Sequence, residues 1–322
     1  MLLSAPAIGR VLTAGAFCFL GAGRLSLADE GGAGFWQPGQ NASFVAVPAE
    51  TGFSLQLVYL QRAAAAAVER PILIGGNIAA GYSTTNSLVY VTPAYTFGTP
   101  VLGGQFAISG SLPMGREQTS TSAQLAAPGG ASISASQNES LVALGDFSPM
   151  ASLKWTAGPH NFMGYVTANV PTGYYSPTNI ASLGLGHWAI DQGLAYTFLG
   201  TSGFEASITA GVTANFMNPS TQYLSGADGH VDLGISYSAK SAGYVGLVGY
   251  AYRQLSGDSG PGARLGPFES QVFGAGPQAG YGFVLGRTRV DLNVRAYKEF
   301  DARNRPEGWS AWLTVALSRS SQ

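Results

Sequence analysis

The sequence is poor in charge. Asp, Glu, Lys and Arg make up 10% of the residues, against roughly 25% in typical soluble domains. The solvated faces of a soluble β-sandwich need more charge than this, which favours a membrane protein. The 16 basic and 17 acidic residues nearly balance, so no basic surplus indicates nucleic acid as a partner.

Cysteine and long apolar runs are also scarce. The single cysteine, Cys18, lies near the N-terminus, so the rest of the chain forms no disulfide. After residue 28 there is no uncharged apolar stretch of the about 18 residues that a spanning helix needs. Because lipid offers the backbone no hydrogen-bond partners, only helices and closed barrels span a bilayer. The composition therefore predicts a closed β-barrel.

The N-terminus predicts export. Arg10 precedes the apolar run VLTAGAFCFLGAG, and Ser26 and Ala28 occupy the small-residue positions of a signal-peptidase site. We expect the mature chain to begin near Asp29. The predicted organisation is a signal peptide at 1–28, an N-terminal segment at 29–71 that is a plug or an extra strand, a barrel at 72–318 and a tail at 319–322.

Apolar and polar residues alternate strictly between Phe204 and Phe216. One parity is entirely apolar, whereas the other carries Glu205, Thr209 and Asn215. Because successive side chains of a strand point to opposite faces, this segment has one face for lipid and one for the lumen of a barrel. The same pattern recurs more loosely along the chain.

Short and long links alternate between the expected strands. The short links lie at 98–104, 157–160, 200–203, 238–243 and 285–288, and the long polar ones at 115–138, 172–190, 217–230, 255–270 and 300–308. This arrangement predicts an all-β fold: a single antiparallel transmembrane β-barrel of about 12 strands, with short periplasmic turns and long extracellular loops. The segment 52–61 is either a further hairpin partner or an N-terminal plug, so a barrel of about 14 strands is the alternative. We expect 115–138 to be a mobile outward loop.

Polar and charged side chains on the inward faces are the candidates for the lumen lining. They are Asp146, Lys154, Glu205, Asn215, Arg289, Asp291, Arg295 and Glu299. Buried charges are costly unless they are paired or hydrated. This mixed set fits either a salt-bridge network that closes the barrel or a wet constriction that selects solutes.

Aromatic and histidine residues of the long links are the candidates for the extracellular mouth. They are Tyr174, Tyr175, His187, Trp188, Tyr223 and His230. We expect aromatic rings near the mouth, such as those of Tyr174, Tyr175 and Trp188, to capture apolar rings by stacking. The histidines have no ligand cluster at close spacing, so no metal site and no cofactor are predicted. No nucleophile–His–acid motif is present either, and no catalytic residue is predicted.

Six segments together carry a family resemblance. They are GDFSPMASLKW (145–155), NIASLGLGHWAIDQGLAYTF (179–198), FMNPSTQYLSGADGHVDLG (216–234), VGYAYRQLSGDSGPGARLGPF (247–268), GAGPQAGY (274–281) and YKEFDARNRPEGWSAWLTVAL (297–317). As an ordered set they resemble the outer-membrane proteins of the "MetA-pathway of phenol degradation" family. The resemblance implies uptake of small hydrophobic or aromatic solutes across the outer membrane of a Gram-negative bacterium.

The same resemblance implies outer-membrane lipid and the barrel assembly machinery as partners. One departure is that the chain runs past Leu317 into SRSSQ, instead of ending on an aromatic residue that the assembly machinery reads. Two other functions stay open: a barrel-embedded enzyme, which would need a nucleophile and a base within hydrogen-bond reach, and a structural barrel with a closed lumen.

Overall fold

The computed structural model describes residues 34–71, 77–126, 132–238, 243–264 and 266–320. The predicted signal peptide lies outside these ranges. The strands are β1 Gly52–Pro71, β2 Asn77–Thr96, β3 Gln105–Ala126, β4 Ser132–Leu144, β5 Ser148–Ala157, β6 His160–Asn169, β7 Ala189–Leu199, β8 Phe204–Asn215, β9 Asp228–Ser238, β10 Gly243–Gln254, β11 Gln271–Leu285, β12 Thr288–Arg303 and β13 Glu307–Arg319. Among the described residues, no helix has the length and hydropathy to span a bilayer.

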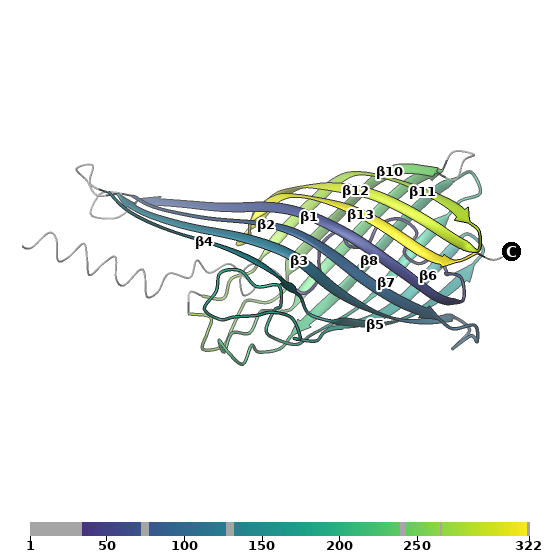
Figure 1. Cartoon of the computed structure of the whole chain (residues 1–322), viewed down its shortest axis with the longest axis horizontal. Coiled ribbons are helices and arrows are strands. Elements are labelled where there is room, and N and C mark those ends of the chain that lie inside the picture. Colours follow the sequence, from purple (N-terminus) through teal and green to yellow (C-terminus); the bar gives the residue numbers. More distant parts are fainter. Residues whose placement is uncertain (1–33, 72–76, 127–131, 239–242, 265, 321–322) are drawn as a thin grey trace, which may run out of the picture.

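The strands close into one antiparallel ring (Figure 1). The first strand, β1, pairs with the last, β13, from Ser54 opposite Ser318 to Ala65 opposite Glu307. β4 and β5 follow one another along the same edge of β3, so the 13 strands form a ring of 12. The predicted antiparallel barrel of about 12 strands is confirmed.

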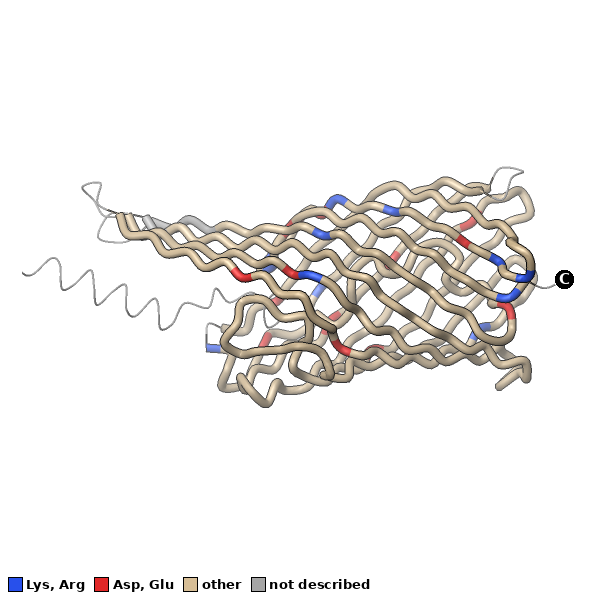
Figure 2. The backbone as a smooth tube through the Cα atoms, viewed as in Figure 1, with Lys and Arg blue, Asp and Glu red and all other residues tan. Residues whose placement is uncertain are grey.

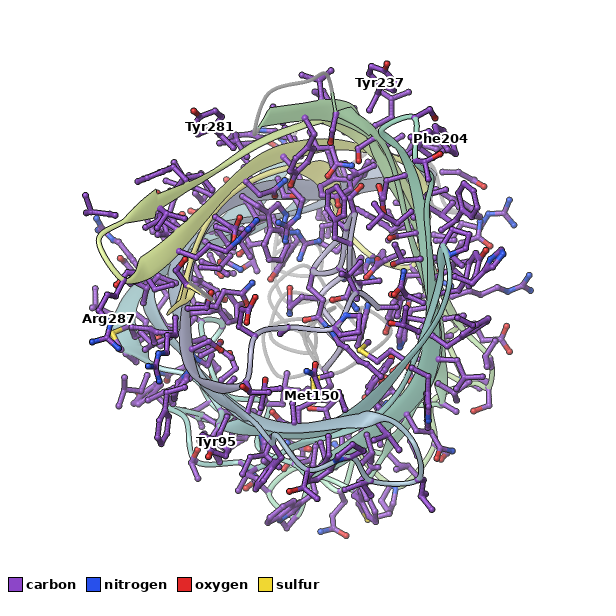
Figure 3. The ribbon with its side chains drawn as sticks, turned by 90° about the vertical axis from the view of Figure 1, so that its right-hand side faces the viewer. Tyr95, Met150, Phe204, Tyr237, Tyr281 and Arg287 are labelled. Atoms are coloured by element: carbon purple, nitrogen blue, oxygen red, sulfur yellow. The ribbon has the colours of Figure 1, made fainter. Side chains whose placement is uncertain are left out.

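The two faces of the ring differ as the alternation predicts. On β8, Phe204 and Ile208 are each 40% exposed on the outside, whereas Glu205 is 0% and Thr209 is 1% exposed. Tyr95, Tyr237 and Tyr281 project outward near the ends of their strands (Figure 3), as in the aromatic girdle of an outer-membrane barrel. Figure 2 shows how thinly charged residues are spread along the strands.

The barrel begins at Gly52, twenty residues before the boundary expected at residue 72. β1 contains the run Ala63–Ala67, and alanine is a weak strand signal. Pairing with β2 and β13 on both sides nevertheless holds this run in the wall. The preceding residues 34–51 enter the lumen, where Figure 3 shows them inside the ring.

Residues 115–126 and 132–138 lie in strands and not in a loop, which corrects the expectation from the sequence for the described part of 115–138. They belong to β3 and β4, which pair from Met114 opposite Leu144 to Ala126 opposite Ser132. Ser, Thr, Gln and Gly dominate the segment and resemble loop composition, yet β2 offers β3 a continuous ladder. Residues 300–308 are likewise mostly strand, with only 304–306 between β12 and β13.

Beyond the ring, β1 to β4 continue as a four-stranded sheet that extends to the left in Figure 1. We call residues 66–71, 77–87, 115–126 and 132–144 the outer sheet. It lies at the end of the barrel that carries the long loops 170–188, 216–227 and 255–270, which is the extracellular end. The short turns and the C-terminus lie at the opposite end.

Candidate functional site: the plugged lumen

Residues 34–51, the plug segment, are held in the lumen by their main chain. Asp232 on β9 accepts hydrogen bonds from the N–H groups of Gly39 (2.9 Å) and Asn41 (3.2 Å). Three strands further around the ring, Arg295 on β12 donates to the carbonyl oxygens of Gly39 (3.1 Å) and Gln40 (3.0 Å). One acidic and one basic side chain therefore hold the same stretch of backbone from two sides.

Two more predicted lumen residues bind the plug segment further along. Glu205 on β8 accepts a hydrogen bond of 2.9 Å from the N–H of Phe44. Lys154 on β5 donates from Nζ to the carbonyl oxygen of Val47 at 2.9 Å. Glu205 and Arg295 are at most 5% exposed. These inward charges thus hold a peptide inside the barrel, a role that the sequence did not indicate for them.

Glu299 on β12 forms an ion pair inside the lumen. Its Oε1 lies 3.4 Å from NH2 of Arg62 on β1 and accepts a hydrogen bond of 2.9 Å from the hydroxyl of Tyr250. Arg62 was not among the sequence candidates, because it lies in a segment that the sequence placed before the barrel. The pair joins strands that are distant in sequence but close around the ring.

Asp146 lies in the break between β4 and β5 and anchors a loop. It accepts hydrogen bonds from Asn169 (2.8 Å) and from the N–H groups of Gly173 and Leu185 (2.7 Å each). Because it is 5% exposed and bonded to both ends of the 170–188 loop, Asp146 fixes the shape of that loop.

Asn215, Arg289 and Asp291 lie near the ends of their strands. Asn215 donates to the carbonyl oxygen of Gly226 at 2.7 Å and to Asp228 at 2.9 Å, which ties down the loop after β8. Arg289 and Asp291 bind each other at 2.8 Å near the inner end of β12, with side chains 52% and 43% exposed. Arg289 also feels the opposite charge of Glu50, at the end of the plug segment.

The candidates for the mouth are divided between the loops and the outer wall. Tyr174 is 43% exposed, and the hydroxyl of Tyr175 accepts a 2.8 Å hydrogen bond from Asn218, which links two outer loops. Tyr223 is buried and donates to Asp258, and His187 is also buried. These contacts shape the outer loops.

Trp188 lies on the outer wall. It is 51% exposed and shares the parity of Ile190 and Leu194, the exposed outward residues of β7. Its carbonyl oxygen continues the ladder to Phe216. Trp188 therefore lies beside the lipid-facing residues. The stacking hypothesis would require its ring to lie over the lumen.

His230 lies inside the barrel, which corrects its expected place in a loop. β9 already begins at Asp228, and His230 is 3% exposed. Its Nε2 lies 2.8 Å from Asp191, and its ring stacks on Trp36 of the plug segment with centroids 3.6 Å apart. The sequence missed the start of the strand because Asp and Gly at its head indicate a turn.

Apolar and aromatic side chains cover the lumen on the side of β1, β2 and β10–β13. We call this cluster the aromatic wall; it comprises Val58, Leu60, Leu88, Val248, Tyr250, Tyr252, Val272, Tyr297 and Trp312. Their neighbours in the chain, such as Tyr59, Leu247 and Leu313, are exposed on the outside. The strands β7–β9 carry Asp191, Glu205, His230 and Asp232 on their inward faces. Charged side chains also lie among the residues of the aromatic wall, since Arg62 and Glu299 pair beside Tyr250 and Arg295 lies over the ring of Trp312. The apolar surface of the lumen is therefore concentrated on the wall strands, where a few buried charges interrupt it.

The comparisons with known proteins agree with this architecture. Residues 65–315 match the family described as "Putative MetA-pathway of phenol degradation". The chain belongs to this family. The resemblance inferred from the six sequence segments is thereby confirmed. No curated protein sequence matches the chain.

Among solved structures, this chain is similar to the COG4313 outer membrane channel from Pseudomonas putida F1. The TM-score is 0.67 at 12% identity, over 87% of this chain and 100% of that chain. A Pseudomonas aeruginosa FadL homologue gives a TM-score of 0.40 at 10% identity, over 90% and 95% of the two chains. The first similarity shows that this chain has the fold of an outer-membrane channel.

Asp232 on β9 and Trp36 of the plug segment were not among the residues selected from the sequence, although both join the plug segment to β9. A signal for Asp232 exists, because it shares its parity with Asp228 and His230 on one strand. Nothing near Trp36 indicates that it reaches β9. No group of three His, Cys, Asp or Glu side chains suited to a metal ion occurs in the described ranges.

Proposed function

We propose that the protein is a non-enzymatic channel that passes small hydrophobic or aromatic solutes across the outer membrane. The aromatic wall is the observation that carries this proposal. Buried aliphatic and aromatic side chains line one side of the lumen continuously from β10 to β2. The ring of an apolar solute packs favourably against such a surface, because the contact removes apolar area of both from water. Membership in a family named for phenol degradation supports the same solute class.

The solute enters at the extracellular end and moves along the aromatic wall beside the plug segment. Tyr250 and Tyr297 stand where the wall meets the plug, with ring centroids 5.0 Å apart, and Tyr297 donates to the carbonyl oxygen of Gly39. Displacing the plug segment from this contact widens the path. Asp232, Glu205 and Arg295 bind the main chain of the plug and are not assigned contacts with the solute.

Substitution of Leu60 tests this proposal. Leu60 is 1% exposed in the aromatic wall, so Leu60→Asn places an amide where an apolar solute passes. We expect uptake of ring-labelled toluene into cells expressing the variant to fall about tenfold, since burying an amide without a partner costs about 1–3 kcal/mol. Leu60→Met keeps the apolar volume and serves as the matched control.

Three readouts decide the outcome. Heat-modifiable migration in gels verifies that each variant forms a closed barrel. Equal uptake by both folded variants contradicts a route along the aromatic wall. An intracellular solute recovered in chemically altered form, in cells without catabolic enzymes, contradicts a non-enzymatic channel.

A structural barrel with a closed lumen is the second candidate, and the plug segment favours it. At least five main-chain groups of the plug, those of Gly39, Gln40, Asn41, Phe44 and Val47, bind the wall. A plug that never moves leaves toluene uptake equal to that of cells without the protein.

Export and assembly complete the proposal. Cleavage near Asp29 by signal peptidase leaves a few residues ahead of the plug segment, and the barrel assembly machinery inserts the mature chain into the outer membrane. The Arg10-headed apolar run supports the first step. The antiparallel ring with an outer apolar face supports the second.

A further inference from the structure

The outward face of the first strands changes from apolar to polar at a definite row of the sheet. Tyr59, Val89, Met114 and Leu144 lie side by side in register on this face. The next outward residues on β1 to β3 are Gln61, Ser87 and Arg116. On β4 the change comes one step later, after Val142, as expected for strands that tilt in the membrane. The hydrocarbon layer therefore ends close to this row.

The outer sheet rises well above that boundary. β1 continues for eleven residues, from Gln61 to Pro71, paired with β2 throughout. At about 3.3 Å per residue, this is a projection of about 30 Å along the strand. Figure 1 shows the outer sheet continuing in the direction of the barrel's long axis. Its outward face therefore points away from the barrel axis, toward the headgroup region above the neighbouring lipids.

Hydroxyl and amide groups dominate this outward face. They come from β2, β3 and β4, and include Ser83, Thr85, Ser120, Ser122, Ser136 and Asn138. Arg116, at the boundary row, is the only charged residue on this face among the side chains that the structure describes. It donates to Ser140 at 3.0 Å. The face carries dense hydrogen-bonding capacity and almost no net charge.

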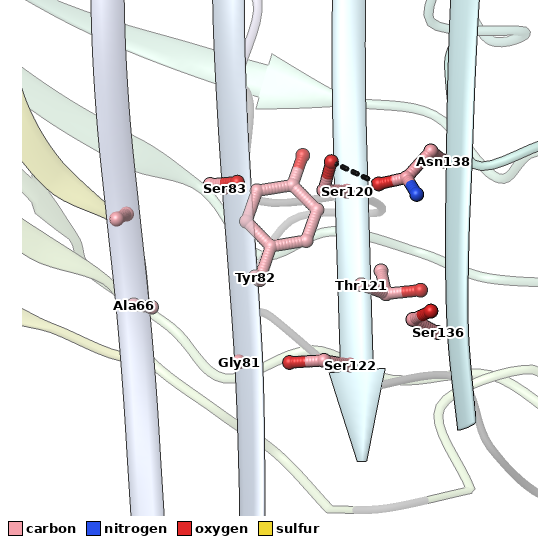
Figure 4. Close-up of a pocket in the computed structure, with 10 residues that line it drawn as sticks. Ala66, Gly81, Tyr82, Ser83, Ser120, Thr121, Ser122, Ser136 and Asn138 are labelled. Atoms are coloured by element: carbon pink, nitrogen blue, oxygen red, sulfur yellow. Dashed lines mark hydrogen bonds between the residues drawn. The ribbon is translucent and has the colours of Figure 1, made fainter. Parts of the chain in front are cut away.

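A shallow groove of about 310 Å³ crosses the outer sheet at this height (Figure 4). Ser83, Ser120 and Asn138 lie in its lining, with Ser120 donating to Asn138 at 2.5 Å. Gly81 keeps the groove open, because a Cβ at that position would lie 2.9 Å from Oγ of Ser122. A side chain there would fill the space that the groove offers to a ligand.

We propose that the outward face of the outer sheet binds the saccharide chains of the glycolipid in the surrounding outer leaflet. Hydroxyl and amide side chains both donate and accept hydrogen bonds, as the hydroxyl groups of sugars do. Arg116 lies at the height of the headgroups, where it pairs with phosphate.

A second copy of the chain fits this face less well. Protein interfaces concentrate apolar and aromatic residues at their centre, whereas the groove is lined mainly by serine, alanine and glycine. Sugars in the same leaflet also reach the face without any rearrangement, because it stands directly above the lipid-facing residues of the same strands.

Matched outward and inward variants test the proposal. Ser120→Ala with Asn138→Ala removes a pair that faces outward, and the inward control is Gln137→Ala, at a residue of the next pair in register that does not line the groove. Gly81→Leu is a third variant that fills the groove. Each full-length protein is refolded in detergent and titrated calorimetrically with lipid-free core oligosaccharide from lipopolysaccharide, and separately with lipid A.

We expect the oligosaccharide to bind the wild type and the inward variant alike. The outward variant and Gly81→Leu should bind it at least about tenfold more weakly, since each lost hydrogen bond contributes about 1 kcal/mol. The proposal is overturned if no protein binds the oligosaccharide, if the inward variant loses as much as the outward one, or if only lipid A binds. Dimers in light scattering without oligosaccharide binding would overturn it in favour of a second copy.

Discussion

At the scale of single residues, Asp232 has the most direct hold on the plug segment. Both of its carboxylate oxygens accept main-chain N–H groups of the plug, and the side chain is 2% exposed. A charged acceptor contributes about 1.5–3 kcal/mol per hydrogen bond. Losing this residue therefore weakens docking of the plug more than losing any neutral contact in the lumen.

Asp232→Leu should loosen the plug segment. The N–H groups of Gly39 and Asn41 lose their acceptor, so the undocked state becomes more populated and ions pass more often. Planar-bilayer recordings of the refolded protein should show more frequent and larger current steps than those of the wild type. Docking is expected to weaken by about 2 kcal/mol.

Asp291→Leu is the control for this experiment. Asp291 pairs with the half-exposed Arg289 near the inner end of β12, whereas the N–H groups of Gly39 and Asn41 donate to Asp232. Its conductance should stay at the wild-type level. An Asp232→Leu protein that is equally silent would contradict a plug held by this carboxylate.

At the scale of elements, two carboxylates attach the 170–188 loop to the outer sheet. Glu139 on β4 accepts hydrogen bonds from the N–H groups of Ile180 (2.6 Å) and Ala181 (3.0 Å). Glu117 lies on the adjacent strand β3, just above the membrane boundary. Burial raises the pKa of Glu117 from 4.5 to about 7, against the lowering effect of hydrogen bonds from Thr119 and the Ser182 main chain.

Docking of this loop should therefore weaken as the pH rises. Below about 4.5 the Glu117 carboxyl is protonated whether or not the loop is docked, and docking is at full strength. Between that value and about 7 only the docked state keeps the proton, so docking weakens by up to about tenfold per pH unit. Hydrogen exchange at Ile180 and Ala181, corrected for the intrinsic pH dependence, should be slower at pH 5 than at pH 8.

Glu117→Gln supplies the matched comparison, because the amide keeps the shape of the side chain without a titrating proton. Its corrected exchange rates should no longer change across the same pH range. A pH dependence identical to that of the wild type would contradict the assignment of the effect to Glu117.

The sequence predicts some elements better than others for physical reasons. β8 is readable because lipid and lumen impose opposite chemistries on its two faces, from Phe204 to Asn215. The outer sheet lies beyond the lipid, so both faces of β3 and β4 carry mostly polar residues there and the segment resembles a loop. The outer part of β1 is hard to predict for a related reason, because its run of alanines shows no alternation of apolar and polar residues.

The site is less predictable than the strands. The hydrogen bond between Gly39 and Asp232 joins residues 193 positions apart, and no local pattern specifies such a contact. Inward parity correctly marks Glu205 and Arg295 as residues of the lumen side, yet parity does not reveal that a peptide occupies the space in front of them.

At the scale of the whole molecule, stability depends on where the lipid lies around the ring. Leu194 is 72% exposed at the middle of β7. Leu194→Arg should lower the free energy of unfolding by about 2–4 kcal/mol, because a charge at the bilayer midplane is costly. Urea titration of the protein refolded in liposomes measures this difference.

Val245→Arg tests the depth dependence. Val245 is 65% exposed but lies near the inner end of β10, close to the interface, where the same substitution costs about 0–1 kcal/mol. Equal losses at both positions would contradict the placement of the membrane around the ring.

The ladder between β1 and β13 also determines when the wall can be completed during biosynthesis. Ser54 and Ser318 are partners although 264 positions separate them, so the seam waits for the last residues to be made. A chain that stops before β13 keeps two unpaired strand edges, which lipid does not satisfy. Only full-length chains can seal, and truncated ones are left open to proteases.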